Sequence, residues 1–198
     1  MHRSILLYNI AQVYAAIGLH TEALEYFGAT IKQDPNYSEY YNDRASVLLQ
    51  IGRLEEAEAD YLRAMELSPP YFEVFTNLGQ CYRRMGAFED AIKQYSRALD
   101  LKPSHLLGRL GRAKAYEEAG YRDAAIEDYS AVLAMDASLW EALGNRGALL
   151  YEAGRLQDSL ADLDAAIRLK PEVVELHENR AIVFSEIENS NAVWQKAS

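Results

Sequence analysis

The sequence has almost no cysteine and no long apolar segment. Its one cysteine, Cys81, excludes an intrachain disulfide and is typical of a reducing compartment. No stretch approaches the roughly 18 apolar residues of a membrane span, and the apolar run after Met1 is too short for a signal peptide. We therefore expect a cytoplasmic protein with no membrane partner, and a leader removed before this sequence begins would leave no trace in it.

Basic residues are scarce relative to acidic ones. The chain has 20 Lys and Arg against 30 Asp and Glu, a formal net charge of −10. Nucleic acid and anionic lipid both carry dense negative charge, so an acidic surface disfavours them. We expect no nucleic-acid partner. The hydrophobic content of 49% is nevertheless ample for a folded protein.

Residues arranged for catalysis or metal binding are also missing. None of the four histidines has another histidine or a cysteine at ligand spacing, which argues against a metal site. There is no glycine-rich phosphate loop, and the Glu117–Glu118 pair lies in a regular helical pattern without an enclosing pocket. Cys81 is interpreted as a packing residue rather than a nucleophile. We predict no cofactor and no enzymatic activity.

A strict repeat is the main positive feature of the sequence. Glycine recurs every 34 residues, at Gly18, Gly52, Gly86, Gly120 and Gly154. Proline recurs at the same interval, at Pro35, Pro69, Pro103 and Pro171, with Ala137 in the fourth place. A period of this length predicts stacked supersecondary units. With Ser4 as the first position, the units are 4–37, 38–71, 72–105, 106–139 and 140–173, followed by a remainder.

Small and large residues alternate within each unit in a way that suits two packed helices. Position eight is small, at Ala11, Ala45, Gly79, Ala113, Gly147 and Ala181. Position twenty-four is large, at Phe27, Tyr61, Tyr95, Tyr129 and Leu163. Small residues let helices approach closely and large ones fill the space between them. The glycine suits a helix C-cap and the proline ends the second helix. In the first repeat unit, this pattern therefore predicts helices near residues 5–17 and 21–33.

This pattern resembles the tetratricopeptide repeat, over residues 4 to about 187. The resemblance implies an all-α fold, a right-handed superhelical solenoid of helix–turn–helix repeats. It also implies that the first helices line a concave groove. The chain departs from the family pattern at Ala137, where proline is expected, and at Arg109 and His177, which occupy a position that is usually large and apolar.

The two ends of the repeat region differ. Residues 174–187 are predicted to form a capping helix, with a polar outer surface that repeat arrays need. Residues 188–198 contain Trp194 but show no helical period, so we predict a C-terminal tail that docks on the array or is disordered. No comparable cap precedes Ser4. The N-terminal edge is expected to be exposed, paired with another chain, or truncated.

Arginine and aspartate occur together in particular units. Arginine at position seven accompanies aspartate at position twenty-three in units two, four and five, whereas units one and three have neither. We predict the pairs Arg44–Asp60, Arg112–Asp128 and Arg146–Asp162, and Arg146 or Arg180 could also reach the preceding unit's aspartate. The alternative is a row of arginines that binds phosphate or carboxylate ligands.

Position six of each first helix is rich in asparagine. It reads Asn9, Asp43, Asn77, Gly111, Asn145 and Asn179. The resemblance places this position in the groove, where asparagine ladders of superhelical family members hold extended peptides. An amide both donates and accepts hydrogen bonds, so it can hold a peptide backbone whatever its sequence. The alternatives are that asparagine merely tolerates an exposed position or bonds to a neighbouring helix.

Charge is uneven along the predicted groove. The middle carries Arg83, Arg84 and Lys114, and Tyr8 and Tyr151 add aromatic surface. Acidic residues gather toward the C-terminal end, at Glu117, Glu118, Glu141, Glu152, Glu175, Glu178 and Glu186. One hypothesis is a ligand with a basic segment over this end and an acidic spot over the middle. The other is a solvated acidic face with no such ligand.

One subclass of the family binds the carboxylate tail of chaperones with lysines and asparagines at fixed groove positions. Here those positions carry Tyr8, Gln12, Asp43, Glu73 and Asn77, so acids replace the lysines and we do not expect this function. We predict instead a protein-interaction scaffold or adaptor that binds a peptide segment of a partner. The alternatives are a self-assembling module that forms homo-oligomers through its array ends, and the repeat part of a larger multidomain protein.

Overall fold

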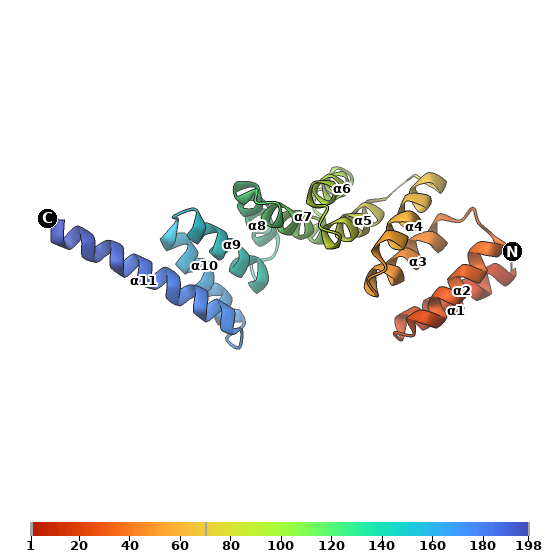
Figure 1. Ribbon diagram of the computed structural model, residues 1–198, viewed down its shortest axis with the longest axis horizontal. Coiled ribbons are helices and arrows are strands. Elements are labelled where there is room, and N and C mark those ends of the chain that lie inside the picture. Colours follow the sequence, from red (N-terminus) through yellow and green to blue (C-terminus); the bar gives the residue numbers. More distant parts are fainter. Residues whose placement is uncertain (1, 70, 198) are drawn as a thin grey trace. The chain divides into compact units, whose positions relative to one another are not determined.

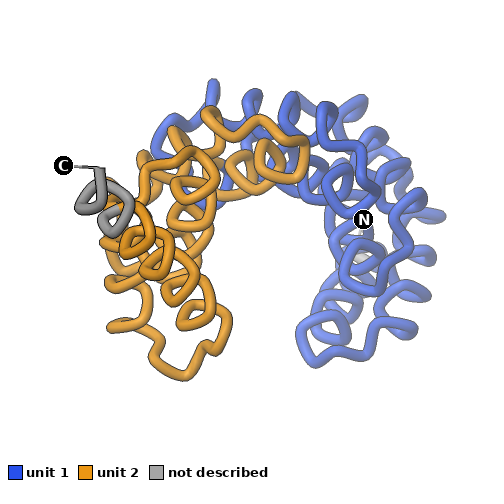
Figure 2. Tube along the Cα trace, turned by 60° about the vertical axis from the view of Figure 1, so that its left-hand side comes forward, with its two compact units in different colours: residues 1–108 blue, residues 109–198 orange. Residues whose placement is uncertain are grey.

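The chain folds entirely into helices. The computed structural model describes the backbone of residues 2–69 and 71–197, and the side chains of residues 3–69 and 71–190. In this part of the chain there are eleven α-helices and no strand (Figure 1). The all-α fold class predicted from the sequence is confirmed. Clustering by proximity divides the chain into two compact units, Met1–Gly108 and Arg109–Ser198 (Figure 2).

The helices follow one another in pairs joined by short turns. The first unit contains α1 (His2–Ala16), α2 (His20–Gln33), α3 (Ser38–Gln50), α4 (Leu54–Leu67), α5 (Phe72–Arg84) and α6 (Phe88–Leu101). Helix α7 (Leu106–Glu118) begins at the end of this unit and continues into the second. The second unit contains α8 (Arg122–Met135), α9 (Trp140–Glu152), α10 (Leu156–Leu169) and α11 (Val174–Ala197).

A glycine ends the first helix of each pair. Gly18 has a φ of 80°, and the other four recurring glycines have φ between 73° and 83°. Only glycine adopts this left-handed conformation without strain. It lets the Leu19 N–H reach back to the Tyr14 carbonyl at 2.9 Å, which closes the end of α1. The 34-residue glycine period is therefore a period of helix ends.

The core lies between the two helices of each pair. Phe27, Tyr61, Tyr129 and Leu163 at position twenty-four are at most 1% exposed. They pack against the small residues of position eight, and this contact leaves no space for a larger residue. A β-carbon added to Gly79 would lie 3.0 Å from the Tyr95 ring, closer than ordinary van der Waals contact.

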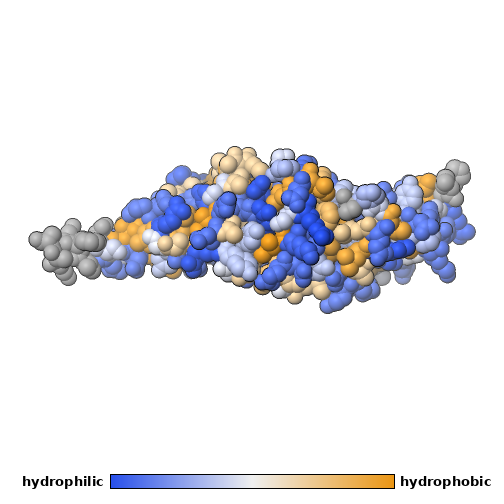
Figure 3. Space-filling model, turned by 90° about the horizontal axis from the view of Figure 1, so that it is seen from above, coloured by the Kyte–Doolittle hydropathy of each residue, from blue (hydrophilic) through white to orange (hydrophobic). Residues whose placement is uncertain are grey.

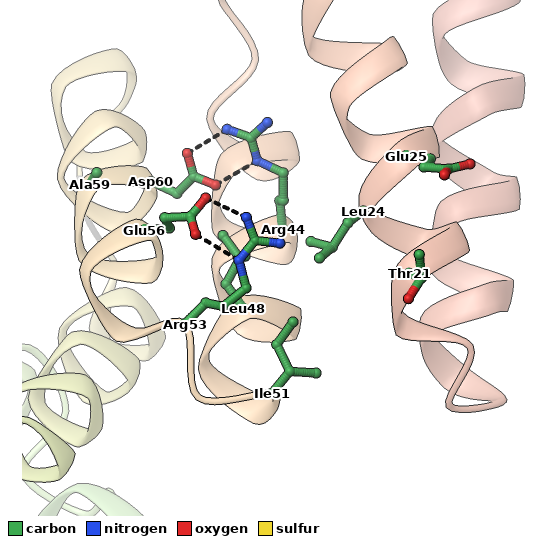
Figure 4. A pocket seen from close by; sticks show the side chains of 10 residues that line it. All are labelled: Thr21, Leu24, Glu25, Arg44, Leu48, Ile51, Arg53, Glu56, Ala59 and Asp60. Carbon is green, nitrogen blue, oxygen red and sulfur yellow. Dashed lines mark hydrogen bonds and ion pairs between the residues drawn. The ribbon is translucent and has the colours of Figure 1, made fainter.

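The three predicted arginine–aspartate pairs are confirmed. Each is a two-pronged contact between the first and second helix of one pair, with N–O distances of 2.6–2.9 Å. Figure 4 shows Arg44 and Asp60. The aspartate side chains are only 5–10% exposed. These arginines are therefore neutralised within the fold, which supports the structural interpretation over the ligand-binding one.

Two arginines at position seven also contact the preceding helix pair, at a position that was not predicted from the sequence. Arg146 donates to the Ser130 hydroxyl at 3.0 Å, and Arg180 binds Asp164 at 2.5 Å. Ser130 and Asp164 both occupy position twenty-five, two places beyond the expected aspartate. Two of the four arginines at position seven, Arg146 and Arg180, thus join consecutive pairs through position twenty-five.

Each departure from the family pattern has a local compensation. Arg109 binds Asp128 at 3.3 Å, beside Arg112. His177 places its Nε2 2.8 Å from the Pro171 carbonyl, as the Tyr41 hydroxyl does with Pro35. Where Ala137 replaces proline, the Asp136 carboxylate accepts hydrogen bonds from the Ser138 amide and hydroxyl and fixes the turn.

The predicted C-terminal tail is wrong in its secondary structure. Helix α11 continues to Ala197, ten residues beyond the predicted helix end at 187, so residues 188–197 are helical. The segment contains no glycine or proline to stop a helix, and a helix without a partner needs no apolar period. The Trp194 side chain lies outside the described residues.

Apolar residues also reach the surface. Figure 3 shows them in patches among hydrophilic residues on one face. No described helix is long and apolar enough to cross a membrane.

Removing one buried aspartate tests whether the ion pairs stabilise the fold. Asp128→Ala leaves Arg112 and Arg109 without their carboxylate in a half-buried site, so we expect the free energy of unfolding to fall by about 3 kcal/mol. Glu56→Ala is the matched control, because its pair with Arg53 is exposed. Denaturant unfolding measures both. Equal effects of the two substitutions would contradict a structural role for the buried pairs.

Candidate functional site

The position-six residues lie on the first helices and occupy three kinds of surroundings. Two asparagines line cavities, two residues are held by internal hydrogen bonds, and one lies at the N-terminal face. The first helices that carry them are α1 (Asn9), α3 (Asp43), α5 (Asn77), α9 (Asn145) and α11 (Asn179).

Asn77 lines a polar cavity of about 270 Å³ in the first unit. The wall consists of Ser46, Leu49, Gln50, Tyr61, Gln80 and Arg84, from α3, α4 and α5. The Ser46 and Tyr61 hydroxyls lie 3.2 Å apart, and Arg84 donates a hydrogen bond to the Leu49 carbonyl. Burial raises the pKa of Tyr61, so its hydroxyl stays protonated. The Asn77 amide makes no hydrogen bond to a described side chain and is available.

Asn179 lines an equivalent cavity of about 180 Å³ in the second unit. Its wall consists of Ala148, Tyr151, Glu152, Leu163, Ile182 and Val183, from α9, α10 and α11. Apart from Arg84 and Val183, these are the same repeat positions, three repeats later, but the chemistry differs. Ala148 and Leu163 replace the two hydroxyls, and Ile182 replaces Gln80. The second cavity is therefore mainly apolar, with Asn179 at its wall.

Asn145 is held in a buried relay instead of lining a cavity. Its amide donates to the Tyr129 hydroxyl at 2.9 Å, and that hydroxyl donates to the Glu117 carboxylate at 2.5 Å. Burial raises the pKa of Glu117, and the hydrogen bond from Tyr129 lowers it. The relay fixes the orientation of the amide. It also holds one predicted groove carboxylate, Glu117, in a partly buried position.

Asp43 is bound by two residues of α1. It accepts hydrogen bonds from the Tyr8 hydroxyl at 2.6 Å and from the Gln12 amide at 3.0 Å. Burial and the neighbouring carboxylate both raise the pKa of Tyr8. This position therefore presents a carboxylate with polar neighbours, where a carboxylate ligand would be repelled.

Asn9 belongs to a different surface. It is exposed and lines a hollow of about 380 Å³ with Ile10, Val13 and Tyr14 of its own helix. No other described helix supplies a wall to this hollow. The structure thus does not bring Asn9 together with the other position-six residues.

The predicted groove cations are already engaged. Lys114 binds Glu141 at 2.8 Å, Arg84 donates to Leu49, and Arg83 makes an interaction within the protein. Among the acidic residues, Glu152 pairs with Arg122 at 3.1 Å. Four carboxylates on α11 are exposed and form no ion pair with a described residue: the predicted groove residues Glu175, Glu178 and Glu186, and also Glu188. The free charge of this surface is therefore negative and lies on α11.

A further cavity was missed by sequence reasoning. It measures about 560 Å³ and lies between α2 and α4, over α3 (Figure 4). No single residue of the sequence indicated it: Gly28 occupies position twenty-five, where Ser130 and Asp164 of later repeats contact an arginine, but Gly28 does not line the cavity. The Arg44 side chain forms hydrogen bonds with Asp60, and the cavity lies beside these two residues.

Residues suited to catalysis or metal binding do not converge in the part of the chain that the structure describes. There is no group of three or more His, Cys, Asp or Glu residues that could hold a metal ion. Cys81 is fully buried, its Sγ lies 3.3 Å from the Leu54 carbonyl, and burial raises the pKa of the thiol to about 11. A thiol in this state packs rather than reacts.

Comparison with known proteins identifies one family along most of the chain. Family models described as tetratricopeptide repeat match residues 6–37, 37–104 and 110–174. No curated protein matches the sequence.

Several solved structures share the fold. YrrB, described as a TPR protein with an unusual peptide-binding site, is 19% identical with a TM-score of 0.79, covering 90% of this chain and 92% of that one. MamA from Desulfovibrio magneticus is 16% identical with a TM-score of 0.82, covering 86% and 97%. TTC0263 from Thermus thermophilus is 22% identical with a TM-score of 0.63, covering 91% and 98%. At these identities the likeness concerns the fold alone.

The buried relay can be tested through one hydroxyl. Tyr129→Phe removes the donor to Glu117 and the acceptor of Asn145, so we expect a loss of about 1–2 kcal/mol in unfolding free energy. Because the lost hydrogen bond lowers the pKa of Glu117, that pKa should rise further in an NMR titration. Tyr61→Phe is the control, since its hydroxyl meets only Ser46. An unchanged Glu117 pKa would contradict the relay.

Proposed function

We propose, on the premise that this chain belongs to the tetratricopeptide repeat family, that it is a protein-interaction scaffold. It binds extended segments of a partner protein on the first helices of each compact unit. The observation that carries this proposal is the pair of equivalent cavities, each beside an available asparagine. We further propose that residues 4–187 act as one repeat array without catalytic activity, as a cytoplasmic adaptor.

Asn77 and Asn179 hold the backbones of these segments. Each amide carries a donor and an acceptor, which match the carbonyl and N–H of a peptide unit. Such a contact is independent of the ligand's side chains, so it supplies affinity without selecting a sequence. The neighbouring cavity receives a side chain and supplies the selection.

The two cavities favour different side chains. The Asn77 cavity offers the Ser46 and Tyr61 hydroxyls and the Gln80 amide, so it suits a polar side chain that can satisfy them. The Asn179 cavity is smaller and is lined by Ala148, Leu163 and Ile182, so it suits a small aliphatic side chain. A polar group there would lose its hydration without compensation.

Charge adds a second element of selection on α11. Glu175, Glu178 and Glu186 are exposed carboxylates without an ion pair among the described residues. A ligand with basic residues beside its aliphatic anchor would meet them. Support for an acidic spot over Arg83, Arg84 and Lys114 is weaker, because these cations already interact within the protein.

Asn145 and Asp43 contribute less to this mode of binding. The Tyr129 hydroxyl uses the donor side of the Asn145 amide, so its oxygen is the part left for a ligand. The Asp43 carboxylate repels a free C-terminal carboxylate, and its partners Tyr8 and Gln12 already donate their hydrogens to Asp43. The segment is therefore an internal stretch of the partner and not a chaperone tail.

A selected peptide tests the asparagine contacts. We would select ligands from a displayed random-peptide library and measure their affinity by calorimetry. Asn77→Ala/Asn179→Ala should weaken binding about 30- to 150-fold, because each amide contributes about 1–1.5 kcal/mol. Gln33→Ala/Gln157→Ala is the control, since both amides are exposed on second helices. If the two variants bound the peptide with equal affinity, the binding site would not lie on the first helices.

Salt tests the charged part of the proposal separately. The affinity of a peptide with basic residues should fall as ionic strength rises, since salt screens exposed carboxylates. Glu175→Gln/Glu178→Gln/Glu186→Gln should weaken binding at low salt and flatten the salt dependence. An affinity that is the same at low and high salt in the unmodified protein would show that α11 selects no basic segment.

A further inference from the structure

Helix α1 carries an apolar stripe that no described residue covers. Leu6, Ile10, Val13 and Ile17 follow at intervals of four, three and four residues, which places them on one side of the helix and its end. Leu6, Val13 and Ile17 are 59%, 60% and 63% exposed. We call these four residues the α1 face. The opposite side of α1 packs in the core through Ala11.

Two of these repeat positions are buried in the later first helices, whereas position fourteen, Ile17 in α1, is also exposed at Ile51 and Met85. Position three, Leu6 in α1, is Tyr40, Val74, Ala142 and Leu176 elsewhere, and these are at most 4% exposed. Position ten, Val13 in α1, is Val47, Cys81, Leu149 and Val183 elsewhere, and these are at most 6% exposed. In each case the second helix of the preceding pair packs against the first helix. The α1 face is thus a helix-packing surface that lacks its helix.

A helix that covers the α1 face as the internal first helices are covered would be antiparallel and apolar. Helices that are consecutive in the chain and joined by short turns run antiparallel, so the covering helix runs antiparallel to the first helix at every internal position. We propose that the α1 face of a second copy of the chain takes this place, in a two-fold symmetric pair of α1 helices.

The spacing of the α1 face makes it complementary to itself. Intervals of four, three and four read the same in both directions, so antiparallel pairing sets Leu6 against the second copy's Ile17 and Ile10 against its Val13. Such an interface is isologous and closes after two copies. The hollow of about 380 Å³ beside Ile10 and Val13 gives the opposing side chains a place to enter.

Charge also favours this occupant. Among the helices of the described chain, α1 is the one without an acidic residue, in a protein of net charge −10. Two α1 helices therefore meet without repulsion between carboxylates. Antiparallel pairing brings Arg3 to the C-terminal end of the other helix, where its charge interacts favourably with the helix dipole.

The C-terminal end fits the α1 face less well. Ile182 of α11 is exposed, but Glu178 and Glu186 lie one turn before and one turn after it on the same side. An apolar helix placed there would remove both carboxylates from water. Head-to-tail assembly through α11 is therefore disfavoured. One helix face per copy is a small interface, so we expect a dissociation constant on the order of micromolar.

Sedimentation of the full chain tests the pair. We expect a monomer–dimer equilibrium whose dissociation constant rises at least tenfold in Val13→Glu. Helicity, melting temperature and peptide affinity of the monomeric variant should be unchanged, since Val13 is exposed in one copy. Leu107→Glu is the control, because Leu107 is 63% exposed on α7, outside the α1 face. A chain that stays monomeric at millimolar concentration would overturn the proposal and leave a foreign helix as the occupant. A dimer that survives Val13→Glu would overturn it as well.

Cross-linking tests the direction of the two helices. In a Cys81→Ser background, a mixture of Leu6→Cys and Ile17→Cys chains should form a disulfide between unlike chains under mild oxidation. Each variant alone should form little. Disulfides between like chains, or none in the mixture, would overturn the antiparallel pair.

Discussion

The close approach of two helices at a small residue is the contact on which the rest of the structure depends. Position eight is alanine or glycine in every repeat, and position twenty-four fills the adjoining space. At Gly147 an added β-carbon would lie 3.0 Å from Leu163, so even alanine would force a shift. Because this contact recurs every 34 residues, it fixes the register of each helix pair and hence which side of the first helix faces solvent.

The solvent-facing side takes its chemistry from residues that the packing leaves free to vary. Position twenty-four is the clearest case, since it serves the core and the surface together. Where it is Tyr129, the hydroxyl binds Asn145 and Glu117 and occupies the space. Where it is Leu163, no hydroxyl is present and the cavity beside Asn179 is mainly apolar, whereas Tyr61 lines a polar cavity beside Asn77. One fold therefore yields different binding positions along one surface.

Much of the fold could be predicted from the sequence because its determinants are local and repeated. The glycines mark helix ends, and the joint occurrence of arginine and aspartate in the second, fourth and fifth repeats identified their contact. The surroundings of the asparagines could not be predicted in the same way. They depend on combinations of three positions, such as Glu117, Tyr129 and Asn145, that differ from repeat to repeat. The helical end of α11 was missed because the sequence there has no apolar period, although nothing in it stops a helix.

The cavity between α2 and α4 was missed for a related reason, and the sequence predicted an exposed or paired N-terminal edge without identifying the α1 face. Both arise where a repeat lacks a partner that its neighbours possess. A periodic pattern describes what repeats share, and these features are differences between repeats. The same reasoning explains why the asparagines at position six have the same residue type but not the same availability.

The central claim is that Asn77 and Asn179 contact a bound peptide segment directly. The most direct measurement follows the side-chain amide signals of asparagine and glutamine by ¹⁵N NMR during titration with a selected peptide. The account predicts large shifts for Asn77 and Asn179, smaller ones for Asn145, which Tyr129 already holds, and none for Gln33 and Gln157. Shifts confined to Gln33 and Gln157, with Asn77 and Asn179 unmoved, would contradict it.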